Sequence, residues 1–293
     1  MHFLKKRFPE KIRFFNKIIF PPEHSLEIHS LSNFFSQALQ RAVHIDVFLP
    51  PAHFAEEAPA SFPTLVLNDG QDVPAIGLAD TLERLYANDK IPPIIVVAVH
   101  ANENRMQEYG TAGQPDYKKR GSKAQDYADF LLQELLPVLR QRYRIAATAA
   151  QTVIAGFSLG GLSAFDLAWN HPDAFGKVGV FSGSLWWRSK AFTAADPDAH
   201  RIVHDMVAGS AKRKGLRFWL QAGTEDEQED RNKNGIIDAI DDTLDLIKEL
   251  KKLGYHEGRD IRYVEVAGGQ HNPATWGKVM PDFLQWAFRE APH

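Results

Sequence analysis

Short apolar runs along the chain alternate with longer segments in which apolar residues recur at helical spacing. Runs of this kind, bounded by Gly, Pro, Asn or Asp, are typical of strands with both faces covered. One run begins at Ala42, continues as VHIDVFLPP and ends as a strand at Pro50. The other predicted strands are 64–67, 94–99, 153–155, 177–181, 217–221 and 261–266.

The helical spacing predicts five helices. They cover 77–88, 123–140, a segment beginning near Leu159, 238–253 and 274–288. Within the second helix, Pro137 has no N–H and its ring crowds the preceding turn. We therefore expect the helix to kink or end there, one turn before its apparent close. Residues 25–39 show no clean period and are predicted to be edge strands and loop.

This alternation of strands and helices over the whole chain predicts an α/β fold. The expected architecture is one doubly wound, mainly parallel sheet with helices on both faces. The 293 residues, 44% of them hydrophobic, can bury a sizeable core. Because the sequence contains no linker, repeat or low-complexity block, we expect one domain. Residues 42–293 form its α/β body, and residues 1–41 are an N-terminal edge segment of the same domain.

The segment Gly-Phe-Ser-Leu-Gly at 156–160 matches the pattern G-x-S-x-G and lies between a predicted strand and a predicted helix. Serine at the tip of such a sharp turn has a strained backbone, and glycine two residues away on either side removes colliding Cβ atoms. This context predicts that Ser158 is an exposed nucleophile. The backbone amide of Leu159, at the helix start, is then free to donate to an oxyanion.

In this arrangement an acid and then a histidine follow the nucleophile along the chain. His271 directly follows the last predicted strand and is the expected general base. The other candidate histidines between Ser158 and the C-terminus are read as solvated surface residues; they are His171, His200, His204 and His256.

The acid is expected after the strand 217–221, where the sequence reads AGTEDE. Asp226 is the first choice and Glu225 the second. Its role would be to fix the tautomer of His271 and to stabilise the imidazolium. The second oxyanion donor is expected from the loop after strand 64–67. Gly70 lets the backbone approach closely there, and the backbone amide of Gln71 is the predicted donor.

Composition narrows the chemistry. The chain has no cysteine, which excludes a thiol nucleophile, a Cys-ligated metal and disulfides. A net charge of −3 argues against a nucleic-acid partner. No stretch approaches the roughly 20 apolar residues that span a bilayer. The N-terminus also lacks the apolar run and cleavage site of a signal peptide. The sequence thus predicts a cytoplasmic protein with no membrane partner. It is compatible with a homo-oligomer.

The set of matching segments resembles the putative esterase family of α/β-hydrolases, which includes esterase D-type and enterochelin esterases. The segments are LNDGQD at 67–72, RMQEYG at 105–110, DYADFLLQELLPVLRQRYR at 126–144, GFSLGG at 156–161, FSGSLWW at 181–187 and GGQHN at 268–272. The resemblance implies an α/β-hydrolase fold and a triad of Ser158, Asp226 and His271. It also implies that Arg105 and the pair Trp186 and Trp187 line the substrate pocket.

A possible calcium loop follows the predicted acid. The segment 230–241 matches D-x-[DN]-x-[DN]-G, with an acidic residue at its twelfth position. Oxygen ligands at every second residue, a glycine bend and a departing helix are what Ca²⁺ coordination requires. The twelfth residue is Asp, as in dockerin-like loops, and its shorter arm is less suited to bidentate ligation. The candidate ligands are Asp230, Asn232, Asn234, Ile236, Asp238 and Asp241. The alternative is a solvated turn that caps the following helix.

Taken together, the residues predict a serine esterase that acts on a small-molecule carboxylic ester through an acyl-enzyme on Ser158. No cofactor is expected in the chemistry, and calcium would be structural. Two alternatives stay open: an acyltransferase that uses the same triad, and a non-catalytic binding protein with this fold. Because family members act on different esters, the acyl and alcohol parts of the substrate are not fixed by the sequence.

Overall fold

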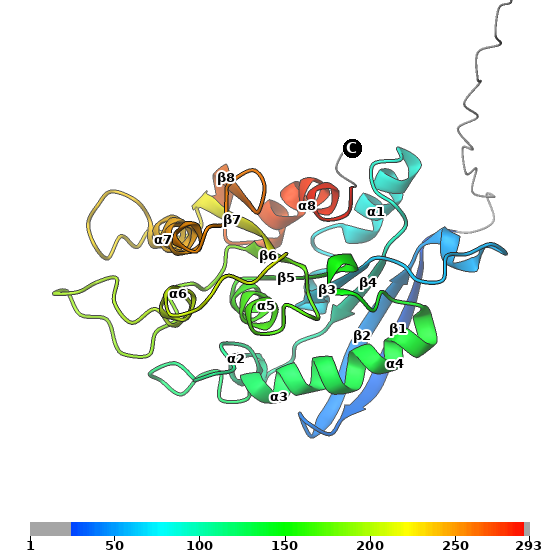
Figure 1. The fold of residues 1–293 in the computed structure, drawn as a ribbon, viewed down its shortest axis with the longest axis horizontal. Coiled ribbons are helices and arrows are strands. Elements are labelled where there is room, and N and C mark those ends of the chain that lie inside the picture. Colours follow the sequence, from blue (N-terminus) through cyan, green and yellow to red (C-terminus); the bar gives the residue numbers. More distant parts are fainter. Residues whose placement is uncertain (1–24, 290–293) are drawn as a thin grey trace, which may run out of the picture.

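Eight strands form one continuous sheet in the order β1-β2-β4-β3-β5-β6-β7-β8 (Figure 1). The computed structural model describes residues 25–289. The strands are β1 (Glu27–Ser36), β2 (Arg41–Leu49), β3 (Thr64–Asn68), β4 (Ile95–Val99), β5 (Thr152–Phe157), β6 (Lys177–Phe181), β7 (Arg217–Glu225) and β8 (Ile261–Gln270).

The strands β3 to β8 are parallel to one another, while β2 pairs antiparallel with both β1 and β4. The predicted α/β fold with a mainly parallel sheet is therefore confirmed. Residues 25–39, in which no clean period was found, contain the edge strand β1, which carries a register shift between Leu31 and Phe34. Residues 1–24 of the predicted N-terminal edge segment lie outside the described residues.

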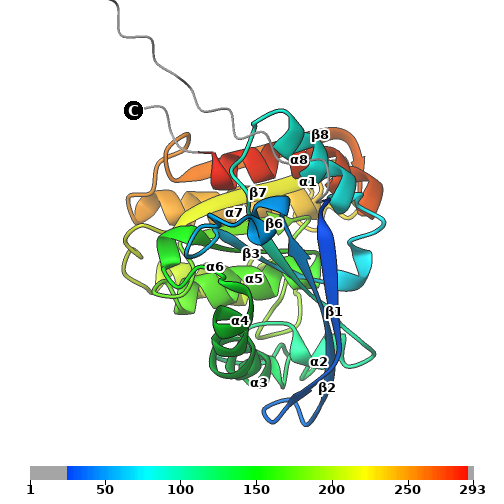
Figure 2. The ribbon, with the colours of Figure 1, turned by 90° about the vertical axis from the view of Figure 1, so that its right-hand side faces the viewer.

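Helices cover both faces of the sheet (Figures 1 and 2). α1 (Leu78–Ala87) and α8 (Pro273–Phe288) pack together on one face. The other face carries the helical segments α3 (Ala124–Asp129), α4 (Leu136–Tyr143), α5 (Leu159–Asn170), α6 (Ile202–Ala208) and α7 (Asp238–Lys252), and the short α2 (Arg105–Glu108) precedes α3. Among residues 25–289, no helix combines the length and apolar content that crossing a bilayer requires.

Burial of both faces explains why the central strands are wholly apolar. Every residue of β3, β4 and β5 is buried. One core lies between the sheet and the α3–α7 layer, and a second lies under α1 and α8. Alternate residues of each strand enter opposite cores, so a single strand such as Ile95–Val99 contributes to both. The continuous apolar runs seen in the sequence follow from this double coverage.

The helix that contains Pro137 does not end there. Instead, a π-helical segment, Phe130–Leu135, connects α3 to α4, and the helix continues to Tyr143. The Leu136 N–H donates to the Leu131 carbonyl five residues earlier. This wider turn makes room for the proline ring, because it moves the carbonyl that an α-helical turn would press against the ring. The expectation was that Pro137 kinks or ends the helix, and the predicted end was wrong for this reason.

His204 also departs from its expected position on the surface. It lies on α6 and is only 6% exposed, and its Nε2 is 2.8 Å from the Asp242 carbonyl oxygen. Burial, together with the nearby guanidinium of Arg201, lowers the pKa of His204 to about 3. This histidine is therefore a neutral core residue that fastens α6 to α7. The short helix that buries it gave no clear signal in the sequence.

Candidate active site

The three predicted triad residues follow strands that end at the same edge of the sheet. Ser158 follows β5, Asp226 follows β7 and His271 follows β8. These strands are parallel, with β6 between β5 and β7. Their carboxyl ends therefore meet at one edge, which is where open α/β sheets bind ligands.

The backbone at Ser158 adopts the sharp turn that the glycines predict. Its φ of 54° and ψ of −122° lie in a region that residues with a Cβ rarely adopt. A Cβ on Gly156 would lie 2.3 Å from the Gly160 carbonyl oxygen, so the elbow closes only with glycine there. The Ser158 N–H donates to the Phe181 carbonyl at 2.8 Å, which fixes the turn to β6.

The hydroxyl of Ser158 lies next to a second serine that the sequence did not single out. Ser158 Oγ and Ser184 Oγ are 3.4 Å apart, and the Ser184 N–H donates to the Ser158 carbonyl oxygen at 3.1 Å. Within residues 25–289, no hydrogen bond joins His271 to Ser158 or to Asp226. Catalytic hydrogen bonds are often long or poorly aligned before substrate binds.

The geometry of the acidic loop favours Asp226 over Glu225. Asp226 Oδ2 accepts the Gly223 N–H at 2.9 Å, while its Oδ1 is buried without a hydrogen-bond partner among the described residues. A buried acceptor left unpaired costs about 1–3 kcal/mol, so this oxygen is suited to accept an imidazole N–H. Glu225 is exposed, and its carboxylate contacts Gln270 at 3.4 Å.

His271 is held by an aromatic side chain of α8. Its ring meets the Trp276 ring edge-on at 5.5 Å, and the Trp276 ring stacks on Phe157 at 4.8 Å. The Trp276 indole N–H also donates to Ser182 Oγ at 3.0 Å. Trp276 thereby contacts His271, the residue before Ser158, and the turn after β6. In the sequence it stood only as an apolar residue of a helix.

The pKa of His271 lies below its ordinary value. Protein atoms packed around the ring disfavour the charged imidazolium, Asp226 opposes this effect, and the positive charge of Arg105 adds to it. The residue still reaches solvent at the edge of the sheet. A lowered pKa keeps the imidazole neutral and able to accept a proton over a wider pH range.

The predicted oxyanion donors come from two adjoining turns. Leu159 is the first residue of α5, and Gln71 lies in a short 3₁₀ turn, Gly70–Asp72, directly after β3. Across the described chain, neither backbone amide donates to another protein group. The Asn68 side-chain amide donates to the Gly160 carbonyl at 2.9 Å and so ties the two turns together. Both amides are thus available at this edge, and their role as donors stays a prediction.

Arg105 is bound mainly to a carboxylate that sequence reasoning passed over. Its guanidinium donates to both oxygens of Asp69 at 2.7 Å, and one nitrogen also lies 3.3 Å from the Phe157 carbonyl oxygen. Asp69 is fully buried and has a positive φ of 61°. Arg105 therefore joins the turn Gly70–Asp72, called the oxyanion turn below, to the turn at Ser158. Its predicted contact with substrate would use the exposed part of its side chain.

The two tryptophans after β6 differ in environment. Trp187 is fully buried and packs against Gly110 and Gly121, so it is a core residue. Trp186 is 37% exposed, and the guanidinium of Arg120 lies 5.1 Å from its ring centroid. Only Trp186 presents a surface that a ligand can reach. A cavity of about 500 Å³ beside α5 is separate from this site, because Asp166 and His171 line it and none of the predicted site residues does.

Comparison with known proteins identifies the family. The model of the family described as "Putative esterase" matches residues 36–287. The chain belongs to the putative esterase family. Its class of activity is accordingly that of a carboxylic ester hydrolase.

Individual relatives are more distant. The chain is 23% identical over 247 residues to the uncharacterized protein YbbA of Bacillus subtilis, covering 83% of this chain and 91% of that protein. It is 29% identical over 192 residues to the iron(III) enterobactin esterase of Escherichia coli, covering 64% of this chain and 43% of that protein. The chain thus spans less than half the length of that esterase.

Solved structures show the same fold. The enterobactin esterase of Shigella flexneri, crystallised in the presence of enterobactin, has a TM-score of 0.69 at 23% identity, covering 91% of this chain and 59% of that chain. A ferulic acid esterase has a TM-score of 0.68 at 20% identity, covering 90% of this chain and 98% of that chain.

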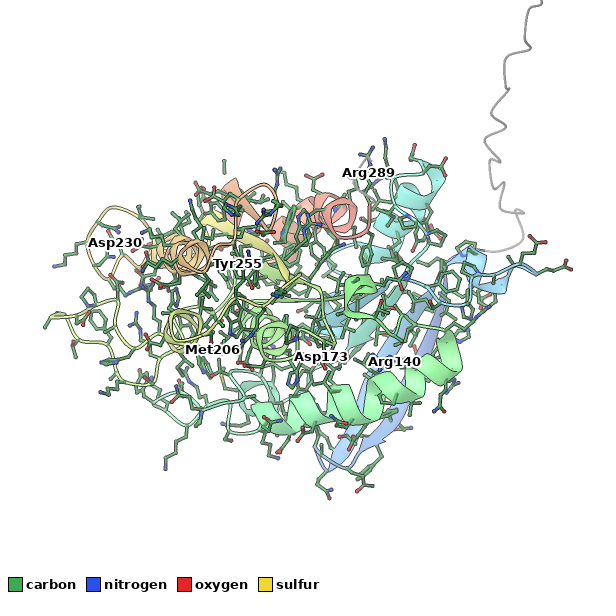
Figure 3. All side chains as sticks on the ribbon, in the orientation of Figure 1. Arg140, Asp173, Met206, Asp230, Tyr255 and Arg289 are labelled. Atoms are coloured by element: carbon green, nitrogen blue, oxygen red, sulfur yellow. The ribbon has the colours of Figure 1, made fainter. Side chains whose placement is uncertain are left out.

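The predicted calcium loop lies at the periphery, between β7 and α7, where Asp230 is labelled in Figure 3. The side chains of Asn232 and Asn234 both reach Asp241 Oδ2, at 2.6 and 3.1 Å. Asp230 Oδ1 accepts the Asn234 N–H at 3.1 Å. Four of the predicted ligands are therefore linked to one another, and Ile236 could add only its carbonyl.

Asp238, another predicted ligand, contacts an arginine of the same loop. Its Oδ1 accepts the Arg231 N–H at 2.9 Å, and its Oδ2 lies 3.2 Å from the Arg231 guanidinium. An arginine within the loop therefore competes with any ion for this carboxylate, and binding of calcium by Asp238 stays a prediction. Calcium binding by the remaining oxygen donors also stays a prediction.

Replacing Trp276 by Phe should lower kcat about tenfold with little change in KM, equivalent to about 1.4 kcal/mol in the barrier. Phenylalanine keeps the stack on Phe157 but loses the hydrogen bond to Ser182, so the turn beside the nucleophile is less well positioned. The measurement is steady-state ester hydrolysis. Trp286→Phe on the same helix is the matched control and should retain wild-type kcat; equal effects of both substitutions would contradict the positioning role.

The acid limb of kcat/KM against pH should have its midpoint below pH 6.5, because the free-enzyme pKa of His271 is lowered. Activity falls as pH decreases through that pKa and the base becomes protonated. Arg105→Gln removes a nearby positive charge, so the midpoint should move to higher pH. Arg84→Gln on α1 should leave it in place. A wild-type midpoint above pH 6.5 would show that this account of the base is wrong.

Removing calcium should lower the melting temperature if the loop 230–241 binds it. An ion present at 100 times its Kd stabilises by about 2.7 kcal/mol, which corresponds to a shift in melting temperature of roughly 4 °C for a chain of 293 residues. The measurement is thermal unfolding with EGTA and after calcium is added back. Asp241→Asn should abolish the calcium-dependent difference and Asp238→Asn should retain it. An equal melting temperature of the wild-type chain with and without calcium would contradict the predicted calcium site.

Proposed function

We propose that the chain hydrolyses a carboxylic ester through an acyl-enzyme on Ser158, with His271 as general base and Asp226 as its orienting acid. The observation that carries this proposal is the positive-φ backbone of Ser158 at the edge of the sheet where Asp226 and His271 also lie. Such strain persists only where the surrounding structure enforces it, and it concentrates at functional sites.

In the proposed reaction, one imidazole nitrogen of His271 takes the Ser158 hydroxyl proton as Oγ attacks the ester carbonyl. The other ring nitrogen donates to Asp226, which stabilises the imidazolium. The amides of Leu159 and Gln71 stabilise the oxyanion. Collapse of the tetrahedral intermediate transfers the proton to the departing alcohol. Water then repeats the sequence and releases the acid.

The substrate we propose is an ester that carries an aromatic ring. Trp186 supports this, because it is 37% exposed and lies two residues after Ser184, which is 3.4 Å from the nucleophile hydroxyl. A flat ring can stack on such an indole. The names of relatives agree, since they include enterobactin and ferulic acid esterases. We further propose that any calcium in the loop 230–241 is structural, because the loop lies outside the reacting residues.

The purified chain should hydrolyse p-nitrophenyl acetate, methyl ferulate or enterobactin, and Ser158→Ala should reduce the rate by 10³-fold or more, since the nucleophile is lost. A serine-reactive fluorophosphonate should label the wild type and the exposed-loop variant Ser61→Ala, but not Ser158→Ala. Labelling of Ser158→Ala would contradict the assignment of the nucleophile.

Two further variant comparisons sharpen this experiment. Asp226→Asn should lower kcat by about 10⁴-fold, whereas Glu225→Gln should stay close to wild type. Trp186→Ala should raise KM for methyl ferulate and leave KM for the acetate unchanged. Product analysis with added alcohol separates hydrolysis from acyl transfer. A fully inactive wild type that still binds these esters would favour the binding-protein alternative.

A further inference from the structure

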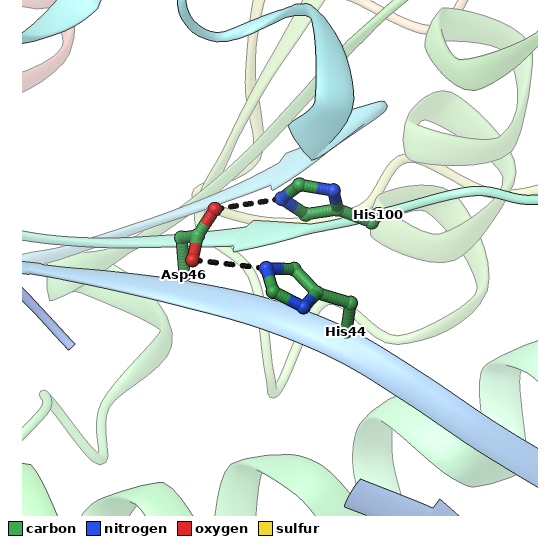
Figure 4. Close-up of side chains that lie close together, drawn as sticks. All are labelled: His44, Asp46 and His100. Carbon is green, nitrogen blue, oxygen red and sulfur yellow. Dashed lines mark hydrogen bonds and ion pairs between the residues drawn. The ribbon is translucent and has the colours of Figure 1, made fainter. Parts of the chain in front are cut away.

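A second group of convergent side chains lies on β2 and at the end of β4, outside the proposed triad. His44 and Asp46 are two residues apart on β2 and therefore project from the same face of the sheet. His100 directly follows β4 and lies opposite His44. The backbone N–H of His100 donates to the backbone carbonyl of His44 at 3.0 Å. Figure 4 shows the three side chains pointing toward one another.

The three side chains meet through the atoms that bind metals. His44 Nε2 is 3.1 Å from Asp46 Oδ1, and His100 Nε2 is 2.7 Å from Asp46 Oδ2. One ligand atom from each residue lies within 4.8 Å of the others. Neighbouring ligands around a tetrahedral zinc ion, at bonds of 2.0–2.1 Å, are about 3.3 Å apart. The two nitrogen–oxygen distances, 3.1 and 2.7 Å, are near this spacing, and the side chains would rearrange around an ion.

The surroundings of the cluster suit a bound ion. Ser30 Oγ, on β1, donates to Asp46 Oδ1, which is the kind of outer contact that orients a metal-binding carboxylate. The side chains of His44, His100 and Asp46 are 36%, 22% and 19% exposed. Solvent can therefore supply the fourth ligand. No arginine or lysine ion pair with Asp46 occurs among residues 25–289 to compete with a cation.

We propose that His44, Asp46 and His100 bind a divalent transition-metal ion of the zinc class. Two imidazoles and one carboxylate are typical ligands of such ions, whereas Ca²⁺ and Mg²⁺ take oxygen ligands. The site is distinct from the proposed triad, but it adjoins the oxyanion turn. The His100 ring packs so closely on Gly70 that a Cβ there would lie 2.7 Å from His100 Cδ2.

A second cluster of ligand-type residues makes a useful contrast. Asp198, Asp241 and Asp245 also bring carboxylate oxygens within 4.8 Å of one another. Arginines occupy two of these carboxylates: Arg231 contacts Asp198 at 2.8 Å, and Arg201 contacts Asp245 at 2.7 Å. Only the cluster with the two histidines combines nitrogen donors with a carboxylate that has no such cationic partner.

The test is a calorimetric titration of the chelator-treated full chain with Zn²⁺. Metal analysis gives the number of bound ions, and the visible spectrum after Co²⁺ substitution reports their geometry. The wild type should bind one ion with a tetrahedral cobalt spectrum. His44→Gln and Asp46→Asn should each weaken zinc binding by at least tenfold, and Ser30→Ala should weaken it by about tenfold through the carboxylate it orients. Circular dichroism of the apo variants checks that they fold.

Control variants separate this site from other histidines. His256→Ala and His271→Ala should bind zinc as the wild type does. Three results would each overturn the proposal: a wild type that binds no zinc, a folded His44→Gln or Asp46→Asn variant with unchanged affinity, or loss of the ion in His271→Ala. Because the readout is metal binding, an inactive enzyme would refute the proposed esterase function and leave this test intact.

Discussion

The positive φ of Ser158 constrains the rest of the site. A backbone of this kind costs of the order of 1–3 kcal/mol and must be enforced by its neighbours. The Ser158 N–H is bound to the end of β6, and its carbonyl oxygen accepts N–H groups from Gly161, Leu162 and Ser184. Glycine at position 156 lets the strand approach the first turn of α5. The sheet, the helix and the turn after β6 together hold one hydroxyl at the sheet edge.

A buried ion pair ties this elbow to the neighbouring turn. Asp69 is inaccessible to solvent, and the Arg105 guanidinium neutralises it with two hydrogen bonds. Removing one member of such a pair typically costs about 3–5 kcal/mol, because the other charge is left buried. The same guanidinium contacts the Phe157 carbonyl and lowers the pKa of His271. One arginine thus couples the turn Gly70–Asp72, the turn at Ser158 and His271.

Much of the fold could be predicted from the sequence, because local chemistry and global packing agree there. The strand Lys177–Phe181 was predicted with its observed bounds, since an apolar run buried on both faces has few alternatives. Strands β7 and β8 extend further than predicted, to Glu225 and Gln270. Their added residues are small or polar, AGTE in β7 and AGGQ in β8, so they show no apolar strand pattern. They pair because β7 lies beside the edge strand β8.

By itself, the sequence determined the order of the elements, the glycines of the elbow and the place of Ser158 and His271 after strands. These features are local: they depend on backbone conformation and on apolar periodicity. Tertiary structure decided the rest. It buried His204 against α7 and brought His100 beside His44. Contacts between residues far apart in the chain depend on strand order and register, and no local pattern encodes those.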